Sequence, residues 1–298
     1  MNDCHTYCVG GHLFAVKSQK GILSEKELKP YVPFQTHCCS EGSDIFTLTI
    51  LSEINSLSHI GNKITELKDE NGCISLFSLP NGDISIHLST NSGDECCRLH
   101  IYQDYRIAKA WINATYRERC YAIDTALMML YTFSSSKYNT LMVHASTVEY
   151  DGNGYLFLGK SGTGKSTHSR LWTEHINGST LLNDDNPIVR IIDGTVYVYG
   201  SPWSGKTCCY RNRRIPVGGI VRLQQAPYNK ITPLTGIKAY ASLLPSCSCM
   251  KWNHEMANAI HSTISEVIEK IPIYSLECLP NQDAAKLCFA ELRSNHKV

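Results

Sequence analysis

The stretch "GKSGTGKS", Gly159 to Ser166, fits the phosphate-binding pattern of a glycine, any four residues, then Gly-Lys-Ser/Thr. A second stretch, "GSPWSGKT" from Gly200 to Thr207, fits the same pattern. A working phosphate-binding loop needs a strand that runs into the first glycine and a helix that starts at the lysine. The helix is needed because its N-terminus supplies the unpaired N–H groups that hold phosphate oxygens. The flanking residues therefore decide between the two stretches.

The first stretch has the required neighbours. "YLFL" before it is typical of a buried strand, and "STHSRLWTEH" after the lysine contains no Pro or Gly and predicts a helix. Its glycines allow a tight turn that points successive N–H groups at phosphates, Lys165 adds a mobile positive charge, and Ser166 offers a hydroxyl to Mg²⁺. We therefore predict that ATP and Mg²⁺ are cofactors and that the nucleotide is bound by Gly159, Lys160, Ser161, Gly162, Thr163, Gly164, Lys165, Ser166 and Thr167.

The second stretch lacks these neighbours. Pro202 and Trp203 occupy its turn, and "CCYRNRRIPVGGIV" follows the lysine instead of an amphipathic helix. It is therefore not predicted to be a second phosphate-binding loop. Two interpretations stay open: an ordinary loop at the exit of a hairpin, or a loop that brings polar and cationic groups to the transferred phosphate or its acceptor. The residues of the second interpretation are Ser204, Lys206, Arg211 and Arg213.

An acid pair follows the phosphate-binding pattern. Asp184 and Asp185 end the short apolar run of "LLNDD", at the type of strand end where ligands collect in open α/β sheets. Phosphoryl transfer needs a carboxylate to hold Mg²⁺ and benefits from one that orients or deprotonates the acceptor hydroxyl, so we predict a metal site of Ser166, Asp184 and Asp185. "NDDNP" is also good turn chemistry. His144, in the apolar run "LMVHASTV", is either a structural histidine or part of the site.

The composition excludes several classes of partner. The chain has 298 residues, 43% of them apolar and 18% charged, which is typical of a soluble globular protein with room for two domains. A formal charge of +1 without a long basic run predicts neither nucleic-acid nor membrane binding. The N-terminal residues lack the basic and apolar regions of an export signal, so we expect a cytoplasmic protein.

Fourteen cysteines are spread over the chain, and without an export signal they are expected to be reduced thiols. Cys4, His5, Cys8 and His12 are four residues of metal-binding type close together in sequence. They lack a second Cys-x-x-Cys pair or the long loop of zinc modules, so the role of this cluster stays open.

The patterning predicts two domains, 1–115 and 116–298. From His12 to about Ile112, short alternating apolar runs and a hairpin signal at Asn81-Gly82 indicate a β-rich domain, for which we expect a role in acceptor recognition. Residues 117–138 show helical spacing, and the chain then alternates strands and helices, with further helices expected at 238–244, 254–268 and 282–292. This order predicts an α/β fold in the second domain.

The motifs "HAS", "GKSGTGKST" and "NDD", at these spacings, resemble the C-terminal kinase domain of HPr kinase/phosphorylase. They are also similar to the kinase motifs of ATP-dependent phosphoenolpyruvate carboxykinase. The resemblance covers residues 140–192 and implies an α/β fold with the P-loop core of these two families. It also implies ATP-dependent phosphorylation of a protein serine, with Asp184 as base, Lys165, Ser166, Asp185 and Mg²⁺ handling the phosphates, and His144 near the catalytic aspartate.

This sequence departs from the pattern of the HPr enzyme in two ways, and both limit the activity that the resemblance implies. Thr167 stands where the HPr enzyme has an acidic residue, and the downstream signature for phosphorolysis is not recognisable. The expected function is therefore transfer of the γ-phosphate to a hydroxyl of a peptide, a protein or a small hydroxy amino acid. The alternatives are a nucleotide-binding switch without transfer activity and a carboxykinase-like small-molecule enzyme. The acid pair favours transfer, while acceptor identity and oligomeric state have no sequence signal.

Overall fold

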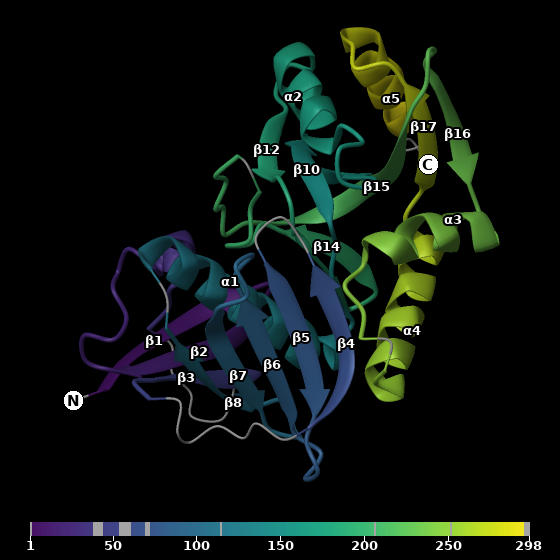
Figure 1. Cartoon of the computed structure of the whole chain (residues 1–298). Coiled ribbons are helices and arrows are strands. Elements are labelled where there is room, and N and C mark those ends of the chain that lie inside the picture. The colour runs from purple at the N-terminus through teal and green to yellow at the C-terminus, as the bar shows by residue number, and fades with distance from the viewer. Residues whose placement is uncertain are drawn as a thin grey trace. The chain divides into compact units, whose positions relative to one another are not determined.

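A computed structural model of the chain describes residues 2–37, 44–53, 61–68, 72–113, 115–205, 207–250 and 252–294. The chain divides into two compact units, Met1–Ser135 and Ser136–Val298 (Figure 1). The boundary predicted from the sequence, 115/116, falls before helix α1 (Tyr116–Ser135) instead of after it. The helix belongs to the first unit because its apolar side packs on strands β3, β7 and β8 of that unit.

The first unit is built on one eight-stranded sheet in the order β1-β2-β3-β8-β7-β6-β5-β4. Strand β3 pairs in parallel with β2 and β8, and the other neighbours are antiparallel. The predicted β-rich first half is confirmed. Its strands are β1 (Asn2–Val9), β2 (His12–Gln19), β3 (Phe46–Leu51), β4 (Asn62–Lys68), β5 (Cys73–Ser78), β6 (Ile84–Ser89), β7 (Glu95–Ile101) and β8 (Ile107–Ile112), with a 3-10 helix η1 at Lys29–Phe34.

Helix α1 has a sequence-encoded start and a buried stripe. The Thr115 hydroxyl and backbone N–H both donate to the Glu118 carboxylate, which reaches back over the first turn as in a capping box. Ala122, Ala126 and Leu130 recur at helical spacing and are buried. The helical pattern predicted for this region is therefore confirmed.

The second unit has a mixed sheet in the order β12-β10-β11-β15-β14-β13-β9, with β17 beside β15 and β16 beside β17. Its strands are β9 (Thr140–Met142), β10 (Ala145–Tyr150), β11 (Asn153–Leu158), β12 (Thr180–Asn183), β13 (Ile188–Ile192), β14 (Thr195–Tyr199), β15 (Arg214–Gln225), β16 (Lys230–Leu234) and β17 (Ile273–Cys278). Its helices are η2 (Ser136–Tyr138), α2 (Lys165–His175), α3 (Gly236–Leu243), η3 (Leu244–Ser246), α4 (His254–Lys270) and α5 (Gln282–Ser294).

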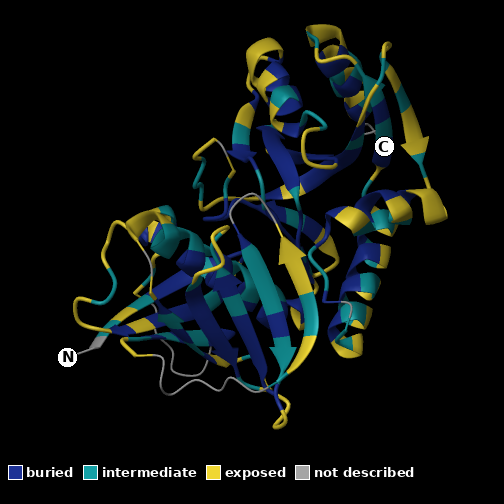
Figure 2. Ribbon diagram, in the orientation of Figure 1, coloured by how far each residue is buried: buried dark blue, intermediate teal, exposed yellow. Residues whose placement is uncertain are grey.

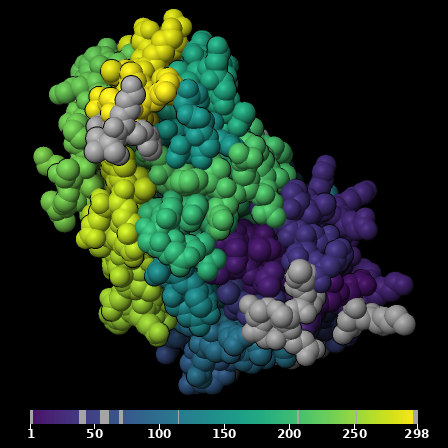
Figure 3. Space-filling model, turned by 180° about the vertical axis from the view of Figure 1, so that it is seen from behind, coloured from purple at the N-terminus to yellow at the C-terminus, as the bar shows by residue number. Residues whose placement is uncertain are grey.

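Strand β11 is buried on both faces, which explains its continuous apolar sequence. Tyr155 and Phe157 point into a core cluster completed by α2 and α5, whereas Leu156 and Leu158 point into the cluster completed by α3 and α4. Figure 2 shows the strands as a dark blue layer between helices with exposed outer sides. The yellow surface of α5 lies beside the teal surface of α2 in Figure 3.

The apolar run "LMVHASTV" around His144 is not one continuous strand. This segment forms two strands, because β9 pairs with β13 whereas β10 pairs with β11 and β12. His144 lies at the break between them, and its backbone N–H donates to the Ser246 carbonyl at 2.7 Å. His144 is therefore not a strand residue, which leaves its side chain free of the sheet pattern.

The three predicted C-terminal helices are confirmed as α3, α4 and α5. Two central strands were not predicted: β15, which precedes α3 and contains Pro216 and two glycines, and β17, which lies between α4 and α5. Both pair in parallel with a neighbouring strand: β15 pairs with β11, and β17 pairs with β15. None of the described helices has the length and apolar character that a membrane crossing requires.

Candidate active site

The phosphate-binding pattern at Gly159–Ser166 connects the end of β11 to the start of α2. Gly162 has φ 78° and Gly164, the N-cap of α2, has φ 107°, in the left-handed region that L side chains rarely adopt. The helix begins at Lys165, so its first N–H groups face the loop. The strand and helix context predicted for this stretch is confirmed.

Lys165 is the first residue of α2, and its side chain is buried beside the loop. Its Nζ donates a hydrogen bond to the Gly159 carbonyl at 3.0 Å. Burial lowers the pKa of Lys165, while the nearby negative charges of Asp185 and Asp184 act in the opposite direction. The lysine and the acid pair are therefore electrostatic neighbours in the folded chain.

Asp184 is joined to helix α2 through two serine hydroxyls. Its Oδ1 accepts a hydrogen bond from Ser146 Oγ at 2.8 Å, and Ser146 Oγ lies 2.6 Å from Ser169 Oγ. Because an ionised carboxylate only accepts, the Ser146 proton points to Asp184 and Ser169 donates to Ser146. Ser169 stands one helical turn after Lys165 on the same face of α2. The chain of hydroxyls thus holds the phosphate loop and the acid pair together.

The second oxygen of Asp184 indicates a cation site. The residue is 4% exposed, and its buried Oδ2 has no hydrogen-bond partner among the residues that the structure describes. An anionic oxygen buried in this way is stabilised by a cation. Mg²⁺ prefers oxygen ligands and is commonly held by one or two carboxylates plus phosphate oxygens. Asp184, the half-exposed Asp185 carboxylate and the exposed Ser166 hydroxyl fit this requirement.

Asp185 lies on the accessible side of the pair. Its Oδ1 is 3.4 Å from His144 Nε2, with side-chain exposures of 36% and 43%, respectively. The Asn186 side-chain amide donates to Oδ2 at 2.6 Å, and the Ala145 backbone N–H donates to the Asp185 carbonyl at 2.9 Å. The segments "HAS" and "NDD" are therefore side by side, with an exposed histidine–carboxylate pair.

The second match to the phosphate pattern is a loop that supports the acid pair. The described residues between Gly200 and β15 form no helix, and β15 is the next element. The Asn183 side-chain amide donates to Ser201 Oγ at 3.1 Å, and the Trp203 carbonyl accepts from the Asn186 N–H at 3.2 Å. A Cβ on Gly205 would lie 3.2 Å from the Asp185 Cβ. These contacts place the loop against "NDDN".

The position of Gly200 requires glycine for a reason unrelated to phosphate binding. A Cβ at this position would lie 2.0 Å from the Arg211 carbonyl oxygen, so the backbone approach requires glycine. Ser204 Oγ donates within the loop, to the Thr207 carbonyl at 2.7 Å. Lys206 lies outside the described residues.

Arg211 and Arg213 lie beside Glu149 and not beside the phosphate loop, so their role at the transferred phosphate or its acceptor stays a prediction. Arg213 pairs with Glu149, and an Arg211 nitrogen lies 3.5 Å from the same carboxylate. Glu149 faces Gly154 at the start of β11, whereas the loop leaves the other end of that strand. The buried Glu149 carboxylate explains the placement, because a buried charge requires opposite charges.

The N-terminal cluster of Cys4, His5, Cys8 and His12 is spread over the hairpin of β1 and β2. Cys4 and Cys8 share one face of β1 and His5 points to the other, while His12 is buried on β2. Across the described ranges, no three His, Cys, Asp or Glu side chains are grouped so that they could hold a metal ion.

A family model described as "SynChlorMet cassette protein ScmC" matches residues 113–281, which is more than half of the chain. The chain belongs to the ScmC family. The matched region of this ScmC-family chain contains the phosphate loop, the acid pair and His144. No curated protein matches it.

Among solved structures, the Hpr(Ser) kinase/phosphatase from Coxiella burnetii is similar at 14% sequence identity and a TM-score of 0.31. The similarity covers 52% of the ScmC-family chain and 90% of the other.

Sequence reasoning missed three residues of the site. Ser146 is part of the quoted "HAS" but was given no role, and Ser169 was not singled out. The spacing of Ser169, four residues after Lys165, is the signal that places it on the same helix face. His168, buried beside the loop, follows the same pattern with Trp172, whose indole N–H donates to His168 Nε2 at 3.2 Å.

The hydroxyl chain predicts unequal effects of two serine substitutions. Ser146→Ala leaves the buried Asp184 carboxylate without its donor, and we expect a loss of about 2–3 kcal/mol in the free energy of unfolding. Ser169→Ala removes only a hydroxyl-to-hydroxyl bond, for which we expect about 1 kcal/mol. Urea unfolding followed by tryptophan fluorescence measures both. Equal losses would show that Asp184 does not depend on Ser146.

Proposed function

We propose that the protein is an ATP-dependent kinase that transfers the γ-phosphate to a hydroxyl of a peptide, a protein or a small hydroxyl-bearing molecule. The observation that carries this proposal is the Ser169–Ser146–Asp184 connection, which fixes the phosphate loop and an acid pair in one site. A loop of this type supplies backbone N–H groups and Lys165 to the β- and γ-phosphates. The acid pair then serves the metal and the acceptor.

The charges of the site are consistent with a nucleotide held through cations. Two carboxylates beside a triphosphate repel it unless positive charge lies between them. Lys165 supplies one positive charge, and Asp184, Asp185 and Ser166 offer oxygen ligands for Mg²⁺. Mg²⁺ held by these residues would supply positive charge to the phosphate oxygens.

Burial favours a division of roles opposite to the one implied by the resemblance. Asp184 is buried and fixed by Ser146, which suits a metal ligand, whereas Asp185 is half exposed and paired with His144, which suits contact with an acceptor. In the proposed step the acceptor hydroxyl oxygen forms a bond to the γ-phosphorus as the bond to the β–γ bridging oxygen breaks. The hydroxyl proton passes to Asp185, ADP leaves, and His144 orients the carboxylate.

The half-exposed His144–Asp185 pair also favours phosphoryl transfer over the alternative of a nucleotide-binding switch without transfer activity. Nucleotide binding alone needs the loop and a cation, and gains nothing from a solvent-facing base held by a histidine and by Asn186. The β-rich first half is proposed, as before, to recognise the acceptor. This role stays a prediction.

The loop lysine is expected to control nucleotide affinity. Lys165→Ala removes a charge-assisted hydrogen bond to phosphate, and we expect ATP to bind about 10- to 100-fold more weakly. Calorimetric titration with a non-hydrolysable ATP analogue and Mg²⁺ measures the effect. Lys206→Ala, at the corresponding lysine of the second pattern match, is the matched control and should retain wild-type affinity. An equal loss in both variants would contradict the choice of phosphate loop.

The two aspartates are expected to fail differently. Asp185→Asn should retain nucleotide affinity and lower the transfer rate about 10²- to 10⁴-fold, as for loss of a general base. Asp184→Asn should raise the Mg²⁺ concentration needed for half-maximal rate, because it weakens a metal ligand. Transfer rates over a Mg²⁺ series test both variants. A slow Asp184→Asn variant together with a raised Mg²⁺ requirement in Asp185→Asn would identify Asp184 as the base. Wild-type transfer rates in both variants would exclude a catalytic pair.

A further inference from the structure

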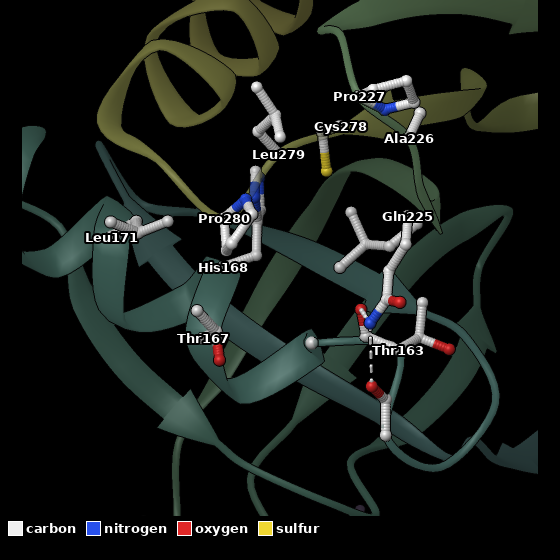
Figure 4. A pocket seen from close by; sticks show the side chains of 13 residues that line it. Thr163, Thr167, His168, Leu171, Gln225, Ala226, Pro227, Cys278, Leu279 and Pro280 are labelled. Atoms are coloured by element: carbon white, nitrogen blue, oxygen red, sulfur yellow. Dashed lines mark hydrogen bonds between the residues drawn. The ribbon is translucent and has the colours of Figure 1, made fainter.

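A cavity of about 600 Å³ adjoins the phosphate loop in the second unit (Figure 4). Thr163 and Gly164 of the loop form one side, and His168 and Leu171 of α2 form another. The remaining wall comes from the ends of β15 and β17 and the residues after them, including Leu279 and Pro280. The walls are mainly apolar, and the loop residues are shared with the phosphate site.

The loop side of the cavity is held in place by β15. Gln225, the last residue of that strand, donates from Nε2 to the Gly162 carbonyl at 3.2 Å, and Figure 4 shows its side chain reaching toward the loop. This bond fixes the loop backbone relative to the cavity. A ligand whose phosphates occupy the loop is therefore positioned to place its other end in the cavity.

His168 lines this cavity with a ring whose tautomer is fixed by a neighbouring hydrogen bond. The residue is 3% exposed, and its ring packs edge-on against Phe157. The Trp172 indole N–H is only a donor, so Nε2 of His168 is the acceptor and the neutral ring carries its proton on Nδ1. A nitrogen that accepts a hydrogen bond carries no proton, so the donation from Trp172 itself selects this neutral form. Nδ1 makes no hydrogen bond with any described residue.

We propose that the cavity binds the adenine ring of the nucleotide and that His168 Nδ1–H donates a hydrogen bond to one of its ring nitrogens. Adenine has three unprotonated ring nitrogens outside the glycosidic one, N1, N3 and N7, and its flat rings suit walls of leucine and proline. Guanine also has acceptors at N3 and N7, so only a contact at N1, which is protonated in guanine, would select adenine over guanine. Trp172 is then a positioning residue that holds the histidine in the donating tautomer. The inference rests on the proposed function, because it requires a nucleotide in the loop.

Affinities for ATP and its 1-deaza, 3-deaza and 7-deaza analogues test the inference by calorimetry with Mg²⁺. The wild-type protein should bind one of the three analogues about tenfold more weakly than ATP, the expected cost of an unpaired buried donor. His168→Phe should bind ATP about tenfold more weakly and show no further loss with that analogue. His168→Asn, which keeps an amide donor near the Nδ1 position, should recover part of the ATP affinity.

Inorganic tripolyphosphate is the probe that separates this inference from the proposed function. It should bind the wild type and both His168 variants equally, because it occupies only the loop. ATP affinity that is equal in wild type and His168→Phe, with all three analogues binding like ATP, would overturn the adenine site alone. Failure of both ATP and tripolyphosphate to bind the wild type would overturn the proposed function together with this inference.

Discussion

The hydrogen bond from Ser146 to Asp184, supported by Ser169, is the interaction on which the site depends. It joins three elements that are separate in sequence: strand β10, helix α2 and the end of β12. Without it, a buried carboxylate would lack its donor, and the helix that starts at Lys165 would lose a polar contact with the sheet. The position of the acid pair relative to the phosphate loop is thus set by the core of the second unit and not by the loop itself.

The repeated phosphate pattern illustrates how one motif can have two physical causes. In the first copy, glycines with positive φ turn the backbone before a helix. In the second, Gly200 allows the Arg211 carbonyl to approach, and Gly205 allows the loop to lie against Asp185. The second loop still belongs to the site, because it supports "NDDN" through Asn183 and Ser201.

Local patterns predicted much of this structure, and long-range pairing accounts for most of the rest. The phosphate loop and its flanking strand and helix, helix α1, the three C-terminal helices and the hairpin at Asn81-Gly82 all follow from residues close in sequence. Strand β15 was not predicted from the sequence, because its pairing with β11 joins residues about sixty positions apart in the chain. The apolar run around His144 is continuous in sequence and therefore does not reveal the break at this residue. The break arises because β9 and β10 pair with different strands.

The same distinction applies to the site residues. Lys165 and the acid pair were found from motifs, whereas the pairing of Arg211 and Arg213 with Glu149 depends on strand register that no motif encodes. The roles of Asp184 and Asp185 also needed the fold, since their difference is one of burial and adjacent residues in a turn look alike in sequence. His168 was hidden for a similar reason: a histidine in a helix becomes a donor of fixed tautomer only through its contact with Trp172.

The fate of the γ-phosphate tests the central claim most directly. The protein is incubated with γ-labelled ATP, Mg²⁺ and a cell lysate separated by size, and the label is followed in macromolecules, small molecules and inorganic phosphate. The account predicts stable label on a hydroxyl of an acceptor in one fraction, dependent on the added protein and on Mg²⁺. Label that stays in ATP, or that appears only as inorganic phosphate in every fraction, would contradict a kinase.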